Sequence, residues 1–239
     1  MMEQQYNRLR IMLDEQQLTR LQNRCVAIVG LGGVGSFACE SLARCGIKKL
    51  IIVDKDVVEA SNINRQIPAL HSTIGQAKTE VMSKRILDIN PYCEVVALKI
   101  FLDESNFNQV LSQAPDFIID ACDTLATKLM IIETCLKRKI AFISSMGAAN
   151  KADVSKIVIS DLLKTYNDPL AKIIRSKMRK SKLKGKIPVV FSTELPQKPH
   201  DPALITDSLL GSNAFVPSIF GLFCANYCYH YLIKQKINL

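Results

Sequence analysis

The sequence predicts an α/β protein with a Rossmann-like, mostly parallel sheet flanked by helices and a C-terminal extension containing additional antiparallel strands. Apolar segments of strand length at residues 26–29 and 50–53 enclose a glycine-rich turn and a helix-patterned segment, the order of a nucleotide-binding βαβ unit. Short apolar runs at 116–121, 140–144 and 187–191 have the length and composition of strands buried in a sheet.

The remaining elements follow from periodicity and from helix start and stop signals. Residues 75–90 show helical spacing and end at an Asn-Pro pair, and residues 125–138 form a second helical pattern. Strands are predicted at 93–99 and at 154–159, where apolar residues alternate. A helix is expected to open within residues 161–170.

Length and composition indicate one enzyme domain. A chain of 239 residues, 48% of them hydrophobic, can bury a single sizeable core. We expect one domain over 1–239, with an N-terminal arm at 1–24, a nucleotide-binding core at 25–150 and a substrate-binding region with a C-terminal helix at 151–239. The arm lacks the apolar core of a targeting peptide, so we expect a cytoplasmic protein.

The eight cysteines lie mostly within apolar strand or helix patterns, which favours reduced, buried thiols over disulfides. No C-x-x-C pair occurs, so we expect no zinc. The cysteines are Cys25, Cys39, Cys45, Cys93, Cys122, Cys135, Cys224 and Cys228.

The glycine-rich turn predicts a nucleotide site. Glycines let backbone N–H groups approach a phosphate, and the helix that follows offers unpaired donors at its start. Asp54, after the second strand, is placed to hold ribose hydroxyls. The turn alone also fits NAD or a tight turn without a ligand. Its glycines are Gly30, Gly32, Gly33 and Gly35.

The segments after the second strand favour ATP over NAD. An enzyme that cleaves ATP must neutralise a triphosphate, which calls for cations and an acid that can hold Mg²⁺. Arg65 can clamp phosphate oxygens. Lys78 is expected in the first turn of a helix, where a cation opposes the helix dipole, so a lysine there makes more sense if it faces an anion such as the ATP phosphates. Asp123 is a candidate for that acid, although either Asp123 or Thr124 could merely cap the helix that follows. The segments read Asp54-Lys-Asp56, Ser61-Asn62-Ile-Asn64-Arg65-Gln66, Gly75-Gln-Ala-Lys78 and Asp120-Ala-Cys-Asp123.

These ordered motifs resemble the MoeB/ThiF/HesA superfamily of ATP-dependent adenylating enzymes, which are related to ubiquitin-activating enzyme. The resemblance implies phosphate contacts from Arg65 and Lys78, and Mg²⁺ on Asp123. It also implies a homodimer in which an arginine of the arm reaches the partner's ATP; Arg10 fits best and Arg8 is the rival. Further nucleotide contacts are expected from Asp54, Asp56, Asn62 and Gln66.

The formal charge of +9 comes almost entirely from residues 172–186, which hold eight basic side chains and no acid. Such a stretch is typical of a surface that meets a polyanion, although a solvated basic helix without a partner has the same composition. The residues are Lys172, Arg175, Lys177, Arg179, Lys180, Lys182, Lys184 and Lys186.

The order of segments after residue 150 is similar to one branch of the superfamily, the bacterial tRNA threonylcarbamoyladenosine dehydratases. The segments are D-L-L-K-T-Y-N-D-P-L from Asp161, the basic stretch, and F-S-T-E ending at Glu194. This resemblance implies that the partner of the basic stretch is tRNA. It also implies ATP-dependent dehydration of N6-threonylcarbamoyladenosine beside the anticodon of that tRNA, through adenylation of its carboxylate. The alternative is activation of the C-terminus of a ubiquitin-like sulfur carrier protein.

The largely apolar run at 214–233 follows a Pro-rich loop at 196–207. Its proline and tyrosines favour a helix that closes the domain or a dimer face over a membrane span. Cys224 and Cys228 lie four residues apart. They could accept sulfur from a cysteine desulfurase system, although such residues are more often core.

Overall fold

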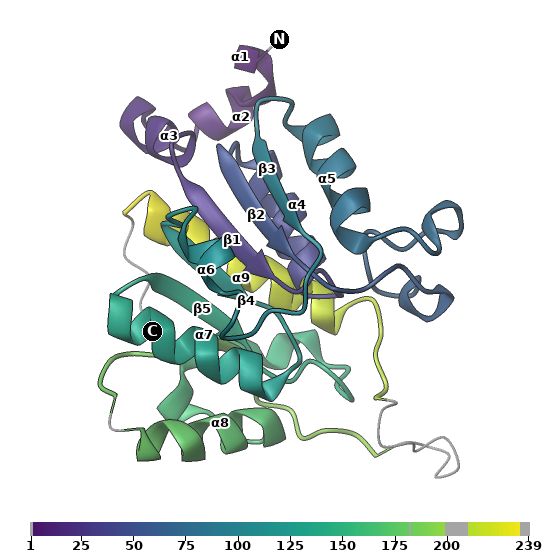
Figure 1. Ribbon diagram of the computed structural model, residues 1–239, viewed down its shortest axis with the longest axis vertical. Helices are drawn as coiled ribbons and strands as arrows, with labels where there is room; N and C mark the ends of the chain where they lie inside the picture. The colour runs from purple at the N-terminus through teal and green to yellow at the C-terminus, as the bar shows by residue number, and fades with distance from the viewer. Residues whose placement is uncertain (1, 182, 199–209, 235–239) are drawn as a thin grey trace.

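The computed structural model describes residues 2–181, 183–198 and 210–234. Its centre is a seven-stranded sheet in the order β3-β2-β1-β4-β5-β7-β6, parallel except for the β6–β7 pair (Figure 1). The predicted fold class is therefore confirmed, including the antiparallel strands of the C-terminal half. The strands are β1 Cys25–Val29, β2 Lys49–Val53, β3 Glu94–Leu98, β4 Phe117–Asp120, β5 Ala141–Ser145, β6 Ile157–Asp161 and β7 Pro188–Ser192.

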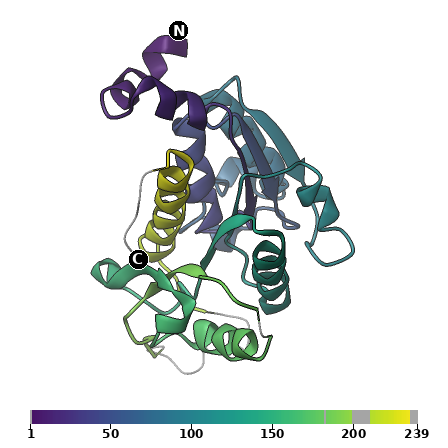
Figure 2. The ribbon, with the colours of Figure 1, turned by 90° about the vertical axis from the view of Figure 1, so that its left-hand side faces the viewer.

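Helices cover both faces of this sheet. One apolar core lies between the sheet and α4, α5 and α9, and a second lies between the opposite face and α6, α7 and α8. Figure 2 shows α9 and α7 on opposite sides of the strands. The α-helices are α1 Met2–Gln5, α2 Asn7–Arg10, α3 Glu15–Leu21, α4 Gly35–Arg44, α5 Lys78–Ile89, α6 Asn108–Leu111, α7 Leu125–Arg138, α8 Pro169–Lys180 and α9 Val216–Leu232. The 3₁₀ helices are η1 Ala60–Asn62, η2 His71–Thr73, η3 Val154–Lys156 and η4 Leu162–Lys164.

Two predicted boundaries are wrong. Helix α5 begins at Lys78, because Gly75 has a φ of +85° and leads into an extended Ala77. The strand predicted at 154–159 lies at Ile157–Asp161, because the Asp153 carboxylate accepts a hydrogen bond from Ser155 N and starts a 3₁₀ turn there.

Helix α9 closes one face of the sheet and packs along α4. Its contact with the glycine-rich turn is tight: a Cβ on Gly221 would lie 2.2 Å from the carbonyl oxygen of Val34. In the part of the chain that the structure describes, no helix combines the length and apolar character needed to cross a membrane. The prediction of a domain-closing helix is confirmed.

The arm formed by α1, α2 and α3 lies at the amino ends of the strands, because α3 leads directly into β1 (Figure 1). The carboxyl ends of the six parallel strands meet at the opposite edge, where α/β sheets bind ligands.

Candidate active site

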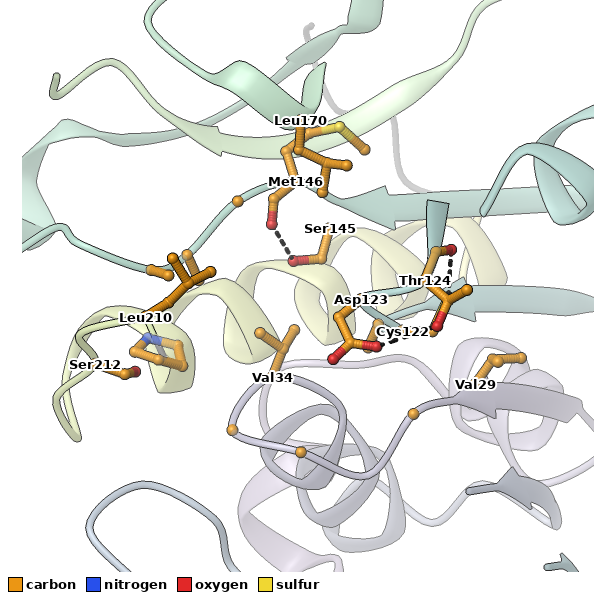
Figure 3. A pocket seen from close by; sticks show the side chains of 18 of the residues that line it. Val29, Val34, Cys122, Asp123, Thr124, Ser145, Met146, Leu170, Leu210 and Ser212 are labelled. Atoms are coloured by element: carbon orange, nitrogen blue, oxygen red, sulfur yellow. Dashed lines mark hydrogen bonds between the residues drawn. The ribbon is translucent and has the colours of Figure 1, made fainter. Parts of the chain in front are cut away.

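A cavity of about 650 Å³ opens along the carboxyl edge of the sheet. Figure 3 labels three of the residues that line it: Asp123, Val34 of the glycine-rich turn, and Ser145 at the end of β5. Most of the predicted nucleotide residues line this cavity, although they come from distant segments. They are Gly30, Gly32, Gly33, Asp54, Asp56, Arg65, Gln66, Lys78 and Asp123.

The glycine-rich turn is packed so closely that an added Cβ would lie within 3.0 Å of a neighbouring atom at Gly30, Gly33 and Gly35. Gly30 has a φ of +91°, and a Cβ there would lie 2.7 Å from the carbonyl oxygen of Ala121. Gly35 does not line the cavity; its Cβ would lie 1.7 Å from the Gly30 carbonyl oxygen. Gly32 is open, with only the Gln66 amide at 3.8 Å from its Cβ position. The turn is therefore shaped by Gly30 and Gly35 and open at Gly32.

Asp54 ties the end of β2 to the turn. Its Oδ2 accepts from Leu31 N at 2.7 Å, and its Oδ1 accepts from Asp56 N at 2.8 Å. These bonds fix a carboxylate at the wall of the cavity, as an acid that meets ribose hydroxyls requires.

Lys78, the first residue of α5, is buried with its Nζ 3.4 Å from Asp56 Oδ2. Asp56 also accepts from Lys55 Nζ at 2.8 Å. Partial burial opposes charge on Asp56, but the hydrogen bond from Lys55 and the charge of Lys78 outweigh it and lower its pKa. Lys55 lines the cavity and is a cation that sequence reasoning missed.

Arg65 lies at the cavity wall without an acidic partner among the described residues. Its Nη1 donates to Ser61 O at 2.9 Å and to Asn64 Oδ1 at 2.8 Å. The neighbouring Gln66 leaves its buried Oε1 without a hydrogen-bond partner. A cation without a counter-ion and a vacant acceptor beside it suit a ligand that carries both anionic oxygens and hydrogen-bond donors, as a nucleotide does.

Asp123 is exposed to the cavity, and its Oδ1 accepts a hydrogen bond from the Thr124 hydroxyl at 3.4 Å. The N-cap of α7 is Thr124, which makes no side-chain capping bond. The interpretation of Asp123 as a mere helix cap therefore loses its support. No group of three or more His, Cys, Asp or Glu side chains in residues 2–181, 183–198 and 210–234 is arranged to hold a metal ion. A single carboxylate beside nucleotide phosphates nevertheless fits the way proteins hold Mg²⁺.

The far half of the cavity was only partly foreseen. The turn after β5 consists of small residues, and Gly147, Ala148 and Ala149 line the wall. Sequence reasoning missed the buried pair of Lys151 and Asp168, whose Nζ and Oδ2 lie 3.6 Å apart. The Asp-Pro at the start of α8 was a signal for Asp168 as a helix cap; nothing in the sequence pointed to Lys151.

Besides Gly35, two predicted nucleotide-site residues lie outside the cavity lining, Arg10 and Asn62. Arg10, on α2, lies at the amino edge of the sheet and is 3.9 Å from Glu15. Asn62 is buried, and its Oδ1 accepts from Glu59 N at 3.3 Å, so it caps η1. Asn62 thus shapes the loop that carries Arg65.

The basic stretch forms α8 and the segment after it. Arg175 is turned inward, where its Nη1 donates to Thr165 O and Oγ1 at 2.6 and 2.5 Å. Lys182 lies outside the described residues, as does most of the Pro-rich loop. The exposed cations are Lys172, Lys177, Arg179, Lys180, Lys184 and Lys186.

Cys224 and Cys228 are fully buried on α9, and burial raises the pKa of both thiols. They belong to the apolar core between α9 and the sheet. This is the core role that their spacing favoured.

The fold and the cavity define a nucleotide-binding enzyme of the Rossmann-like class, with cations and an acid gathered at the carboxyl edge of the sheet. The ThiF family model matches residues 3–238, and the chain belongs to the ThiF family.

Two proteins illustrate how far this similarity extends. The chain is 44% identical to tRNA threonylcarbamoyladenosine dehydratase of Bacillus subtilis, over 97% of this chain and 95% of the relative. It also resembles the crystal structures of the Escherichia coli tRNA N6-threonylcarbamoyladenosine dehydratase TcdA. The complex with ATP has a TM-score of 0.88 and the complex with AMP 0.89, each at 33% identity over 97% of this chain and 95% of that chain.

Proposed function

We propose that this protein is an ATP-dependent tRNA threonylcarbamoyladenosine dehydratase. The carrying observation is that the similarity to such enzymes spans both halves of the chain, including the segments around α8 and β7. Arg65, Lys78 and Asp123 also share one cavity, as ATP cleavage requires. We assign nucleotide binding to residues 25–150 and substrate binding to 151–239.

The first step is attack of the threonyl carboxylate oxygen on the α-phosphorus of ATP, which releases pyrophosphate and leaves an acyl-adenylate. The work of the chain in this step is electrostatic. Arg65 and Lys78 neutralise phosphate oxygens, N–H groups of the glycine-rich turn approach them, and Asp54 orients the ribose.

Magnesium would be held by Asp123, where it would supply positive charge beside the phosphates. Arg10 lies too far from the cavity of its own chain, because β1 separates the two edges of the sheet. We therefore assign Arg10 to the partner's cavity in a homodimer.

In the second step the tethered carbamoyl group attacks the acyl carbon, a proton is lost, and AMP leaves. The sum of the two steps removes one water from the modified adenosine. No enzyme nucleophile is needed, because the attacking group is already attached to the acyl chain and has a high effective concentration.

The exposed cations of α8 are the proposed grip on the tRNA backbone. A tRNA substrate places the enzyme in the cytoplasm. A cysteine desulfurase partner stays a prediction, and the buried Cys224 and Cys228 offer it no accessible sulfur acceptor.

The test is incubation of the purified protein with ATP, Mg²⁺ and tRNA that carries the threonylcarbamoyl group, followed by mild digestion and mass spectrometry. We expect ATP-dependent loss of one water from the modified nucleoside. Unchanged tRNA, together with ATP–pyrophosphate exchange stimulated by a sulfur carrier protein, would overturn the proposal in favour of carrier activation.

A further inference from the structure

The segment that follows β5 is bound at both ends by carboxylates from the C-terminal half of the chain. We call residues 147–153 the acceptor loop. Asp168 Oδ2 accepts from Gly147 N at 3.0 Å, at the start of the loop. Glu194 Oε2 accepts from Ala152 N at 3.0 Å, near its end. The wall of the cavity opposite the glycine-rich turn is therefore held by residues remote in sequence.

The middle of the loop is held by a buried ion pair. The Lys151 side chain is 1% exposed and that of Asp168 is fully buried. Lys151 Nζ lies 3.6 Å from Asp168 Oδ2 and donates to Ser192 O at 3.2 Å. Burial lowers the pKa of Lys151, and the charge of Asp168 opposes that shift.

The same Asp168 begins the basic helix. Its Oδ1 accepts from Ala171 N at 2.9 Å and caps α8, while its Oδ2 faces the acceptor loop. One carboxylate thus joins the helix that carries the exposed cations to the cavity wall.

Stability alone gives a weak reason for such a pair. Apolar residues of similar volume often stabilise a fold as well as a buried ion pair does, because both charges must leave water. What apolar residues would not supply is a directed link between Gly147, Lys151 and the first turn of α8. Because the pair also lies beside the cavity, we take its role to be to set the position of the cavity wall relative to α8.

We propose that Asp168 and Lys151 are positioning residues for the dehydration: they fix the acceptor loop relative to α8 and to the nucleotide. A tRNA held on α8 then presents its threonylcarbamoyl group to the α-phosphate at a set distance. This inference rests on the proposed function. Because intramolecular closure depends on alignment, a shift of about 1 Å in the loop can lower the rate about 100-fold.

The test uses two variants that remove charge and keep shape. Asp168→Asn keeps one acceptor oxygen, which can still cap α8 through Ala171 N, while its amide nitrogen replaces the oxygen that accepts from Gly147 N. Lys151→Met keeps the length of the buried chain. We expect kcat for dehydration to fall about tenfold or more, and the affinities for tRNA and ATP to change by about twofold at most. The kcat of the double variant should be little lower than that of either single variant, because the two residues act as a unit.

Asp161→Asn is the matched control, because Asp161 also caps a helix in this half and lies outside the cavity lining. It should leave kcat unchanged. Should either single variant fail to fold, the double variant, which leaves neither charge without its partner, makes the same kcat measurement.

Unchanged kcat with a lowered melting temperature would overturn the inference and leave the pair a purely structural one. A weakened tRNA affinity with unchanged kcat would overturn it too. If the wild-type protein leaves tRNA unmodified, the proposed function and this inference fail together; active wild type with equally active variants defeats the inference alone.

Discussion

Lys128 Nζ lies 3.1 Å from both carboxylate oxygens of Asp120, and neither side chain has more than 1% of its surface exposed. Ser144 Oγ donates to the same carboxylate at 2.5 Å, and Lys128 also donates to Ser145 O at 2.7 Å. The pair joins α7 to the carboxyl ends of β4 and β5, directly behind the cavity. Asp120 is therefore a structural acid, and Asp123 is the one that reaches the cavity.

Removing one member of this pair should destabilise the whole domain. We expect Lys128→Met to lower the free energy of unfolding by about 3–5 kcal/mol, because it leaves a buried carboxylate without its counter-ion. Urea unfolding followed by circular dichroism measures this. Adding Asp120→Asn should recover part of the loss, because the uncompensated charge is then gone; a single-variant loss below about 1 kcal/mol would contradict the prediction.

Two alanine substitutions in the glycine-rich turn should separate folding from binding. Gly35→Ala places a Cβ against the Gly30 carbonyl, so we expect little folded protein. Gly32→Ala has room in the fold, and its methyl lies at the cavity wall, so we expect a normal melting temperature and about tenfold weaker ATP binding. Thermal unfolding and calorimetric titration with ATP test both. Gly75→Ala is the control: its Cβ meets nothing within 4 Å, but its φ of +85° should cost about 1 kcal/mol without affecting ATP.

Arg65→Ala should remove activity and leave the fold intact. The guanidinium pairs with no acid among the described residues, so its loss strands no buried charge. We expect kcat/KM for ATP to fall about 100- to 1,000-fold. Arg65→Lys should keep only part of the wild-type kcat/KM, because lysine lacks the planar guanidinium whose paired N–H groups can hold two phosphate oxygens at once. Arg85→Ala, which removes an ion pair with Glu40 away from the cavity, is the matched control and should remain active. ATP turnover unaffected by Arg65→Ala would show that the clamp assignment is wrong.

Asp123→Asn should change the response to magnesium. We expect the Mg²⁺ concentration for half-maximal activity to rise about tenfold or more, with little change in melting temperature. Activity measured across a Mg²⁺ titration tests this, with Asp88→Asn, an exposed acid outside the cavity lining, for comparison. Identical titration curves for the two variants would remove Asp123 from the metal site.

Glu40 should contribute stability at neutral pH that acid removes. Burial opposes its charge, but hydrogen bonds and charges from Arg85 and Arg44 outweigh burial and lower its pKa below the ordinary value of 4.5. The lowered pKa means that the contribution is present above about pH 4.5 and is lost as pH falls through the folded-state pKa. We expect the free energy of unfolding of the wild type to exceed that of Glu40→Gln by about 1 kcal/mol or less at pH 7, and this difference to vanish in acid. Urea unfolding of both proteins across the pH range measures it. A difference that stays constant down to pH 3 would contradict this.

The local features of this fold were readable from the sequence. Helix α7 lies at the predicted residues 125–138. It was predictable because the signals for it, the spacing of its apolar residues and the polar residues at its ends, all lie within or next to the helix itself. The strands of the parallel sheet were readable because burial on both faces gives them nearly continuous apolar runs.

The missed features depend on contacts between remote segments. Lys151 and Asp168 are separated by 17 positions and by a strand, and the sequence has no periodicity that pairs them. Arg175 counted as a surface cation, although its guanidinium turns toward Thr165. Arg10 lies away from the cavity of its own chain, so the phosphate contact expected of it stays a prediction.

The contact between α9 and the glycine-rich turn has a consequence for synthesis of the protein. A Cβ on Gly33 would lie 2.9 Å from Pro217 Cβ. The start of α9, the last helix of the described chain, therefore packs against the glycine-rich turn that follows β1. On the ribosome, every nucleotide motif emerges well before that helix does. A nascent chain that has displayed Gly30, Arg65 and Asp123 therefore still lacks a finished ATP site, and we expect competence to bind ATP to arise only when α9 docks.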